Sequence, residues 1–114
     1  MAKTKLPNAL ERRHLLEKDL AASQALRLAE AYLAEERVVE ALAFLRKAGA
    51  DDRLREIGER AVRDGDVFLV RQIAALVGEP PTAEQWSATA AAAEAGGKAR
   101  YAADAARQAT RRGA

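Results

Sequence analysis

The sequence predicts an all-α fold made of antiparallel helical hairpins, about three pairs preceded by one N-terminal helix. Alanine, which has the highest helix propensity, supplies 29 of the 114 residues, whereas Phe, Trp and Tyr together supply five. Strands favour the aromatic and β-branched side chains that are scarce here. Capping residues, glycines and prolines separate the expected helices by links of two to five residues. Links this short make neighbouring helices antiparallel.

Apolar spacing and end signals place the first three helices. Pro7 suits a first helical turn. Two further helices are predicted over about 21–34 and 37–48, and Gly49 is expected to end the latter in the left-handed conformation. The apolar residues that recur along these three helices are Leu10, Leu15, Leu16, Leu20, Leu26, Ala29, Tyr32, Leu33, Val38, Ala41, Leu42 and Leu45.

Aspartate caps and glycine stops delimit the fourth and fifth helices. Asp51 or Asp52 is expected to cap the fourth helix, which Gly65 ends. Asp66 is expected to cap the fifth. The residues predicted to face inward from this pair are Leu54, Ile57, Ala61, Val62, Leu69, Val70, Ile73, Ala74 and Val77.

The double proline at 80–81 separates the last two helices from the others. Thr82 and Gln85 have the spacing of a capping box, which predicts the start of the sixth helix. The glycines at 96–97 end that helix, and the seventh is predicted over about 98–111.

The C-terminal third has an unusual composition, because residues 83–114 contain no Leu, Ile, Val, Met or Phe. Burial free energy scales with apolar area, of which alanine offers little. We expect this third pair to be the least stable and to dock on the second pair mainly through Trp86 and Tyr101. It serves either as a capping hairpin or as a surface that becomes stable only when it binds a partner.

The helix pairs share one internal layout, displaced by 29 and then by 32 residues. The small residues of the first helices are Ala29, Gly58 and Ala90, and the same shifts relate Ala41, Val70 and Ala102 on the second helices. Helices approach to about 8 Å only where the contact residues lack bulk, so we expect the small residues at the closest contacts within each pair. The pattern predicts one helical-repeat domain over 1–114, with an N-terminal helix at 1–20 and pairs at 21–49, 50–81 and 82–112.

Over about residues 22–109 this layout resembles the tetratricopeptide-repeat family, one of the α-solenoids of helical hairpins. The residues that carry the resemblance are Leu28, Ala29, Tyr32, Ala41 and Ala48 in the first pair, Gly58, Gly65 and Asp66 in the second, and Trp86 in the third. The resemblance implies a right-handed stack whose concave groove, lined by the first helix of each pair, binds an extended or helical peptide. Hairpins of the coatomer or clathrin type fit nearly as well from Glu40 to Gly49, and a plain helix bundle is the third alternative.

On that resemblance, a protein or peptide partner would bind at groove positions of the first helices. They are Leu26, Glu30, Leu33, Arg55, Glu59, Val62, Arg63, Ser87 and Glu94. Arg55 and Arg63 share one helix face. There they either form bidentate hydrogen bonds with acidic side chains or form a salt-bridge ladder with Glu59 between them. The family version that grips a terminal carboxylate with Lys and Asn is not expected, because no Asn follows Asn8.

Two alternatives to peptide binding remain, and the first of them follows from the charge distribution. Residues 1–18 carry a net charge of +3, residues 19–97 of −5 and residues 98–114 of +4. Nucleic acid would bind the basic C-terminal segment, with or without the N-terminal one, through Lys98, Arg100, Arg107, Arg111 and Arg112, and through Lys3, Lys5, Arg12 and Arg13. Against this alternative, Tyr101 is the only nearby aromatic residue for base stacking. The other alternative is self-assembly, through the alanine-rich third pair or through an exposed end of the stack.

Residues that enzymes and metal sites use are sparse. The chain has no cysteine and one histidine, which excludes disulfides and thiolate sites and argues against most zinc sites and catalytic triads. A partial likeness to a phosphate-binding loop around Lys98 fails, because Ala99 stands where Ser or Thr is required. We therefore expect no enzymatic activity, no metal and no cofactor. No signal-peptide pattern or membrane-spanning apolar run is found, which predicts a soluble, cytoplasmic protein.

Overall fold

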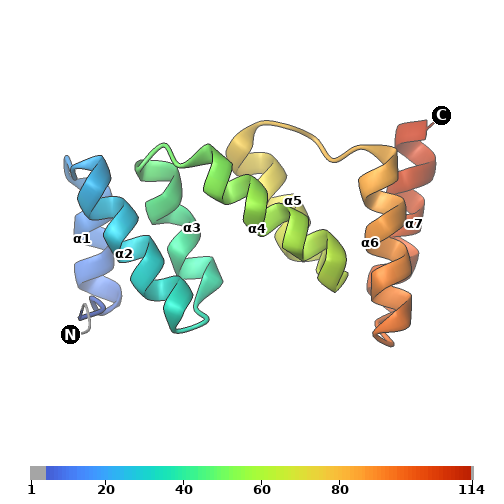
Figure 1. Cartoon of the computed structure of the whole chain (residues 1–114), viewed down its shortest axis with the longest axis horizontal. Coiled ribbons are helices and arrows are strands. Elements are labelled where there is room, and N and C mark those ends of the chain that lie inside the picture. Colours follow the sequence, from blue (N-terminus) through green and yellow to red (C-terminus); the bar gives the residue numbers. More distant parts are fainter. Residues whose placement is uncertain (1–4, 114) are drawn as a thin grey trace. The chain divides into compact units, whose positions relative to one another are not determined.

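A computed structural model describes residues 5–113 and confirms the all-α class. In this range the chain forms seven helices and no strand (Figure 1). The helices are α1 Ala9–Glu17, α2 Ala22–Ala34, α3 Val38–Lys47, α4 Asp51–Asp64, α5 Val67–Val77, α6 Ala83–Ala95 and α7 Ala99–Gly113. None of them is both long enough and apolar enough to cross a bilayer. The chain divides into two compact units, Met1–Leu54 and Arg55–Ala114.

The predicted starts of α5 and α6 are confirmed. The Asp66 side chain accepts a hydrogen bond from the Leu69 N–H at 3.1 Å. At α6, the Thr82 hydroxyl accepts from the Gln85 N–H at 3.1 Å, and Gln85 Oε1 accepts from the Thr82 N–H at 2.8 Å. Both caps satisfy N–H groups for which a helix has no internal partner.

The start of α1 differs from the expectation. Pro7 precedes the helix instead of lying in its first turn, and Asn8 is the cap. Asn8 Oδ1 accepts from the Glu11 N–H at 2.9 Å, and the Asn8 N–H donates to Glu11 Oε1 at 3.1 Å. This reciprocal box fixes the start, because proline offers no side-chain acceptor. The predicted leucine stripe is weak, since no residue of α1 is buried and Leu10 is 62% exposed.

The start of α4 is a second correction. The helix begins at Asp51, and the Leu54 N–H donates to the Ala50 carbonyl at 3.1 Å. Asp51 and Asp52 therefore lie in the first helical turn rather than at the cap position. Carboxylates in this turn are favourable because they lie near the positive end of the helix dipole.

The predicted repeat recurs in the turns inside the three helix pairs. In each turn a backbone N–H donates to the carbonyl five residues earlier: Arg37 to Tyr32 at 2.9 Å, Asp66 to Ala61 at 2.9 Å and Lys98 to Ala93 at 2.8 Å. The residue before each donor has a positive φ, which is 58° at Glu36, 69° at Gly65 and 74° at Gly97. These Schellman-type helix ends are displaced by the same 29 and 32 residues as the packing positions. The chain is therefore a helical repeat in its local geometry.

The helix ends that lead from one pair to the next are also alike. Gly49 and Gly78 lie 29 residues apart and have φ values of 68° and 78°, which confirms the expected left-handed end of α3. The residues after them repeat one hydrogen bond, from Ala50 to Leu45 at 3.0 Å and from Glu79 to Ala74 at 3.1 Å. The links differ in length, because three residues separate α3 from α4 and five separate α5 from α6.

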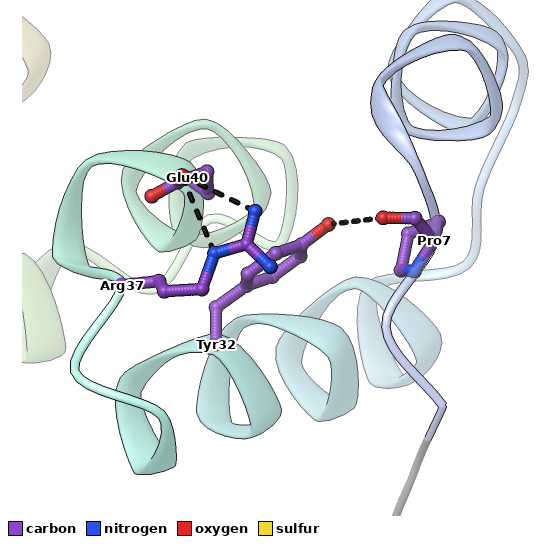
Figure 2. Close-up of polar contacts among 4 residues, drawn as sticks. All are labelled: Pro7, Tyr32, Arg37 and Glu40. Atoms are coloured by element: carbon purple, nitrogen blue, oxygen red, sulfur yellow. Dashed lines mark hydrogen bonds and ion pairs between the residues drawn. The ribbon is translucent and has the colours of Figure 1, made fainter.

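Tyr32 organises the core of the first unit (Figure 2). Its ring is fully buried and stacks on Phe44, a residue outside the predicted inward-facing set, with centroids 5.7 Å apart. The Arg37 guanidinium lies 5.0 Å from the Tyr32 centroid and donates to Glu40 at 3.3 and 3.4 Å. The Tyr32 hydroxyl donates to the Pro7 carbonyl at 3.1 Å. This bond attaches the segment before α1 to α2.

Trp86 of α6 belongs to the core of the second unit. It is 3% exposed and belongs to a cluster with Ala61, Val67, Val70 and Ala105. Tyr101, the other expected anchor of the third pair, is 43% exposed, so that expectation is wrong. From α7, Ala105 belongs to this cluster and Ala109 packs against it, whereas Tyr101 is exposed.

Small residues permit close approaches in the second unit. A Cβ at Gly58 would lie 2.9 Å from Ile73 Cγ2, so the predicted contact between α4 and α5 is confirmed. Gly65, expected only to stop α4, also approaches α6, where an added Cβ would lie 2.6 Å from Ala93 Cα. The other two predicted contact residues are buried or half-buried: Ala29 and Ala90.

Candidate binding cleft

A cleft of about 360 Å³ opens in the second unit. It is lined by α4, α5, the link between α5 and α6, and the start of α6. Its apolar wall consists of Val62, Val70, Ile73, Val77, Pro80 and Pro81. Its polar groups are Arg55, Glu59, Glu79, Thr82 and Gln85. Apolar walls with a few polar groups are typical of ligand sites in proteins.

Helical spacing brings three predicted partner-binding residues of α4 to the cleft. Arg55, Glu59 and Val62 are four and three residues apart, which places them on one helix face. Ile57 and Ala61, on the neighbouring face, are 9% and 1% exposed and belong to the core. The structure thus gathers three of the nine predicted residues in one cleft.

Arg55 is paired within the protein. Its Nη2 donates to Glu79 Oε1 at 2.7 Å, and its Nε donates to Glu79 Oε2 at 3.3 Å. The hydrogen bond from Arg55 keeps the pKa of Glu79 below its ordinary value of 4.5. The predicted ladder through Glu59 is wrong, because Glu59 and Arg63 form no ion pair within residues 5–113. Glu79 can offer both oxygens to the planar guanidinium, which is the favoured geometry for such pairs.

Glu30 in the first unit is also paired within the protein. Its two carboxylate oxygens accept from Nε and Nη2 of Arg53, at 3.0 and 3.1 Å. The predicted neighbours of Glu30 are partly accessible, since Leu26 is 41% exposed and Leu33 is half-buried.

The other predicted partner-binding residues lie away from the cleft. Arg63, Ser87 and Glu94 are exposed on α4 and α6 and are not among the residues that line it. Conversely, sequence reasoning missed Glu79 and assigned Gln85 only to a cap. The signal that could have located this cleft is the five-residue link before α6, which is longer than the three-residue link before α4.

Some of the C-terminal basic residues that were predicted to bind nucleic acid form contacts within the protein instead. The side-chain nitrogens of Lys98 and Arg112 donate to backbone carbonyls at 3.3 and 3.1 Å. Arg107 lies 3.9 Å from the Asp104 carboxylate. The remaining two residues of this set are exposed: Arg100 and Arg111.

The described N-terminal basic residues differ in exposure and in pairing. Lys3 lies outside the described residues. Lys5 is exposed, Arg12 is half-buried, and Arg13 Nε donates to Glu17 at 3.0 Å along α1. Exposed pairs such as the last contribute at most about 1 kcal/mol to stability.

Within residues 5–113, no three acidic or histidine side chains gather closely enough to hold a metal ion. No protein-family model, curated protein or solved structure matches the chain significantly. What the protein does is therefore inferred from the cleft and from the repeated turns.

Proposed function

We propose that the protein is a non-enzymatic interaction module that binds a peptide or a partner helix in the groove of a tetratricopeptide-like stack of hairpins. The observation that carries this proposal is the cleft beside α4, where Arg55, Glu59 and Val62 meet. These side chains come from the first helix of a pair, and the concave surfaces of stacked hairpins bind their ligands there.

The size and lining of the cleft suit part of a polypeptide. Its volume of about 360 Å³ lies at the low end of the range for ligand pockets. Branched apolar side chains form one wall, and charged groups stand beside them. The two prolines of the link at 80–81 restrict its backbone, so this part of the wall is formed before a ligand arrives.

The repeated turns support the stacked arrangement that the proposal requires. Three helix pairs end their first helix with the same hydrogen bond and the same positive φ, at shifts of 29 and 32 residues. Such repeats bury their apolar faces by stacking on their neighbours, and stacking creates an extended surface for binding.

Peptide selection on the full chain tests the proposal. A library of random dodecapeptides displayed on phage is selected on the wild type, on Glu59→Trp, which fills the cleft, and on Ala88→Trp. Ala88 is an exposed residue of α6 that does not line the cleft, so this variant controls for nonspecific binding of peptides to an exposed tryptophan. We expect enrichment on the wild type and on Ala88→Trp, and a loss of about tenfold or more on Glu59→Trp. Equal enrichment on all three proteins, or none on any, would refute the proposal.

The two alternatives predict different results. If nucleic acid is the partner, a single-stranded oligonucleotide binds with an affinity that falls steeply with salt, and Arg100→Glu with Arg111→Glu abolishes this binding. If the protein self-assembles, its mass in light scattering rises with concentration. We expect neither result at physiological salt.

A further inference from the structure

The junctions that follow the first and second helix pairs differ in one ion pair. At the first junction, Glu30 of α2 accepts two hydrogen bonds from Arg53 in the first turn of α4, at 3.0 and 3.1 Å. The corresponding positions, displaced by 29 and 32 residues, are Glu59 in α4 and Gln85 in the first turn of α6. The glutamate is thus repeated, whereas a neutral amide replaces the arginine.

Glu59 consequently lacks the cation that Glu30 has. Gln85 Oε1 accepts from the Thr82 N–H at 2.8 Å and so serves the cap of α6. Arg55, the other cation at the cleft, is paired with Glu79 at 2.7 Å. In the described part of the chain Glu59 forms no ion pair. One arginine and two glutamates line the cleft, which gives it a net negative charge.

We propose that the cleft recognises a basic side chain of the partner, arginine in preference to lysine, next to an apolar residue, and that Glu59 determines this specificity. The inference rests on the proposed function. The partner's guanidinium occupies, at Glu59, the position that Arg53 occupies at Glu30. Its planar group donates to both carboxylate oxygens at once, which an ammonium group does less well.

The surroundings of Glu59 fit such a side chain. Val62, Ile73 and Val77 provide apolar surface for the methylene groups of arginine, which bury readily while the charged end is paired. An acidic or phosphorylated side chain would face the carboxylates of Glu59 and Glu79, and repulsion between like charges would disfavour its binding.

Peptides enriched on the wild-type chain are the probes for this inference. Each arginine is exchanged for citrulline, which keeps the shape of the side chain and removes its charge, and each lysine is exchanged for glutamine. Fluorescence anisotropy gives the affinities for the wild type, Glu59→Gln and Asp19→Asn, a control at an exposed carboxylate that does not line the cleft. We expect exchange of the recognised basic residue in the peptide to weaken binding to the wild type and to Asp19→Asn by about tenfold, equivalent to about 1.4 kcal/mol. The same exchange should leave the already weak binding to Glu59→Gln nearly unchanged.

Two results would overturn the inference. In one, the enriched peptides contain no basic residue in common. In the other, the citrulline or glutamine exchange costs the same on Glu59→Gln as on the wild type. Neither result contradicts the proposed function as long as Glu59→Trp prevents the enrichment of peptides. If peptides are enriched on Glu59→Trp as strongly as on the wild type, both proposals are wrong. Selection on Glu59→Lys gives the reverse test, because acidic residues should then replace basic ones in the enriched peptides.

Discussion

Gly58 shows how one side-chain atom controls the packing of α4 on α5. A Cβ at this position would lie 2.9 Å from Ile73 Cγ2, well inside the 3.5–4.0 Å at which carbon atoms pack best. Glycine in the interior of a helix is unfavourable by itself, so its presence at the shift of 29 residues from Ala29 indicated a close contact. That part of the packing was predictable from the sequence.

We expect Gly58→Leu to lower the free energy of unfolding by about 1–3 kcal/mol through overpacking, although leucine has the better helix propensity. Ala88→Leu, at an exposed position of α6, should change it by about 0.5 kcal/mol at most. Urea denaturation followed by circular dichroism measures both changes. A Gly58→Leu midpoint equal to that of the wild type would show that α4 and α5 do not pack as closely as described.

Other residues show where sequence periodicity is insufficient. Spacing places a residue near a helix face but does not resolve neighbouring positions at the edge of that face. Phe44 is therefore buried although only Val38, Ala41, Leu42 and Leu45 were predicted to face inward on α3, and Tyr101 is 43% exposed although it was expected as an anchor.

At the scale of the elements, the turn between α2 and α3 contains an energetic exception. Glu36 has a φ of 58°, whereas glycine occupies the corresponding positions, Gly65 and Gly97. The left-handed region costs a residue with a Cβ roughly 1–2 kcal/mol, and glycine escapes this cost. The first pair therefore has the same turn geometry as the other two, but its turn is less favourable in free energy.

Replacing Glu36 by glycine should raise the free energy of unfolding by about 0.5–1 kcal/mol. The gain is smaller than the strain because glycine also has more freedom in the unfolded chain. Ala34→Gly, in the last turn of α2, is the matched control and should lower stability. If thermal or urea unfolding shows Glu36→Gly to be as destabilising as Ala34→Gly, the turn does not have the left-handed geometry.

The links were harder to predict than the helices. Capping boxes and glycine stops are local signals, so the starts of α5 and α6 followed from the sequence. The cleft forms where Glu79 of a link meets Arg55 of α4, and no periodic pattern relates these two residues. The length of the link was the only sequence signal, and it does not say what the link will contact.

At the scale of the whole chain, the contacts show which charged residues are available to a partner. The basic C-terminal segment suggested a nucleic-acid surface, but Lys98 and Arg112 donate to backbone carbonyls of the second unit. The acidic middle of the sequence, by contrast, leaves Glu59 at a cleft in the second unit without an ion-pair partner among residues 5–113. The charge available for recognition there is therefore negative, which the net charge of +2 conceals.

An amide chemical-shift map of the full chain, recorded while an enriched peptide is added, tests most directly whether the cleft is the binding surface. We expect the largest shifts within 55–62 and 73–85, which include most residues that line the cleft, and small shifts in α1 and at Arg100 and Arg111. Shifts concentrated along α7, with residues 55–62 unchanged, would contradict the assignment of the cleft as the binding site.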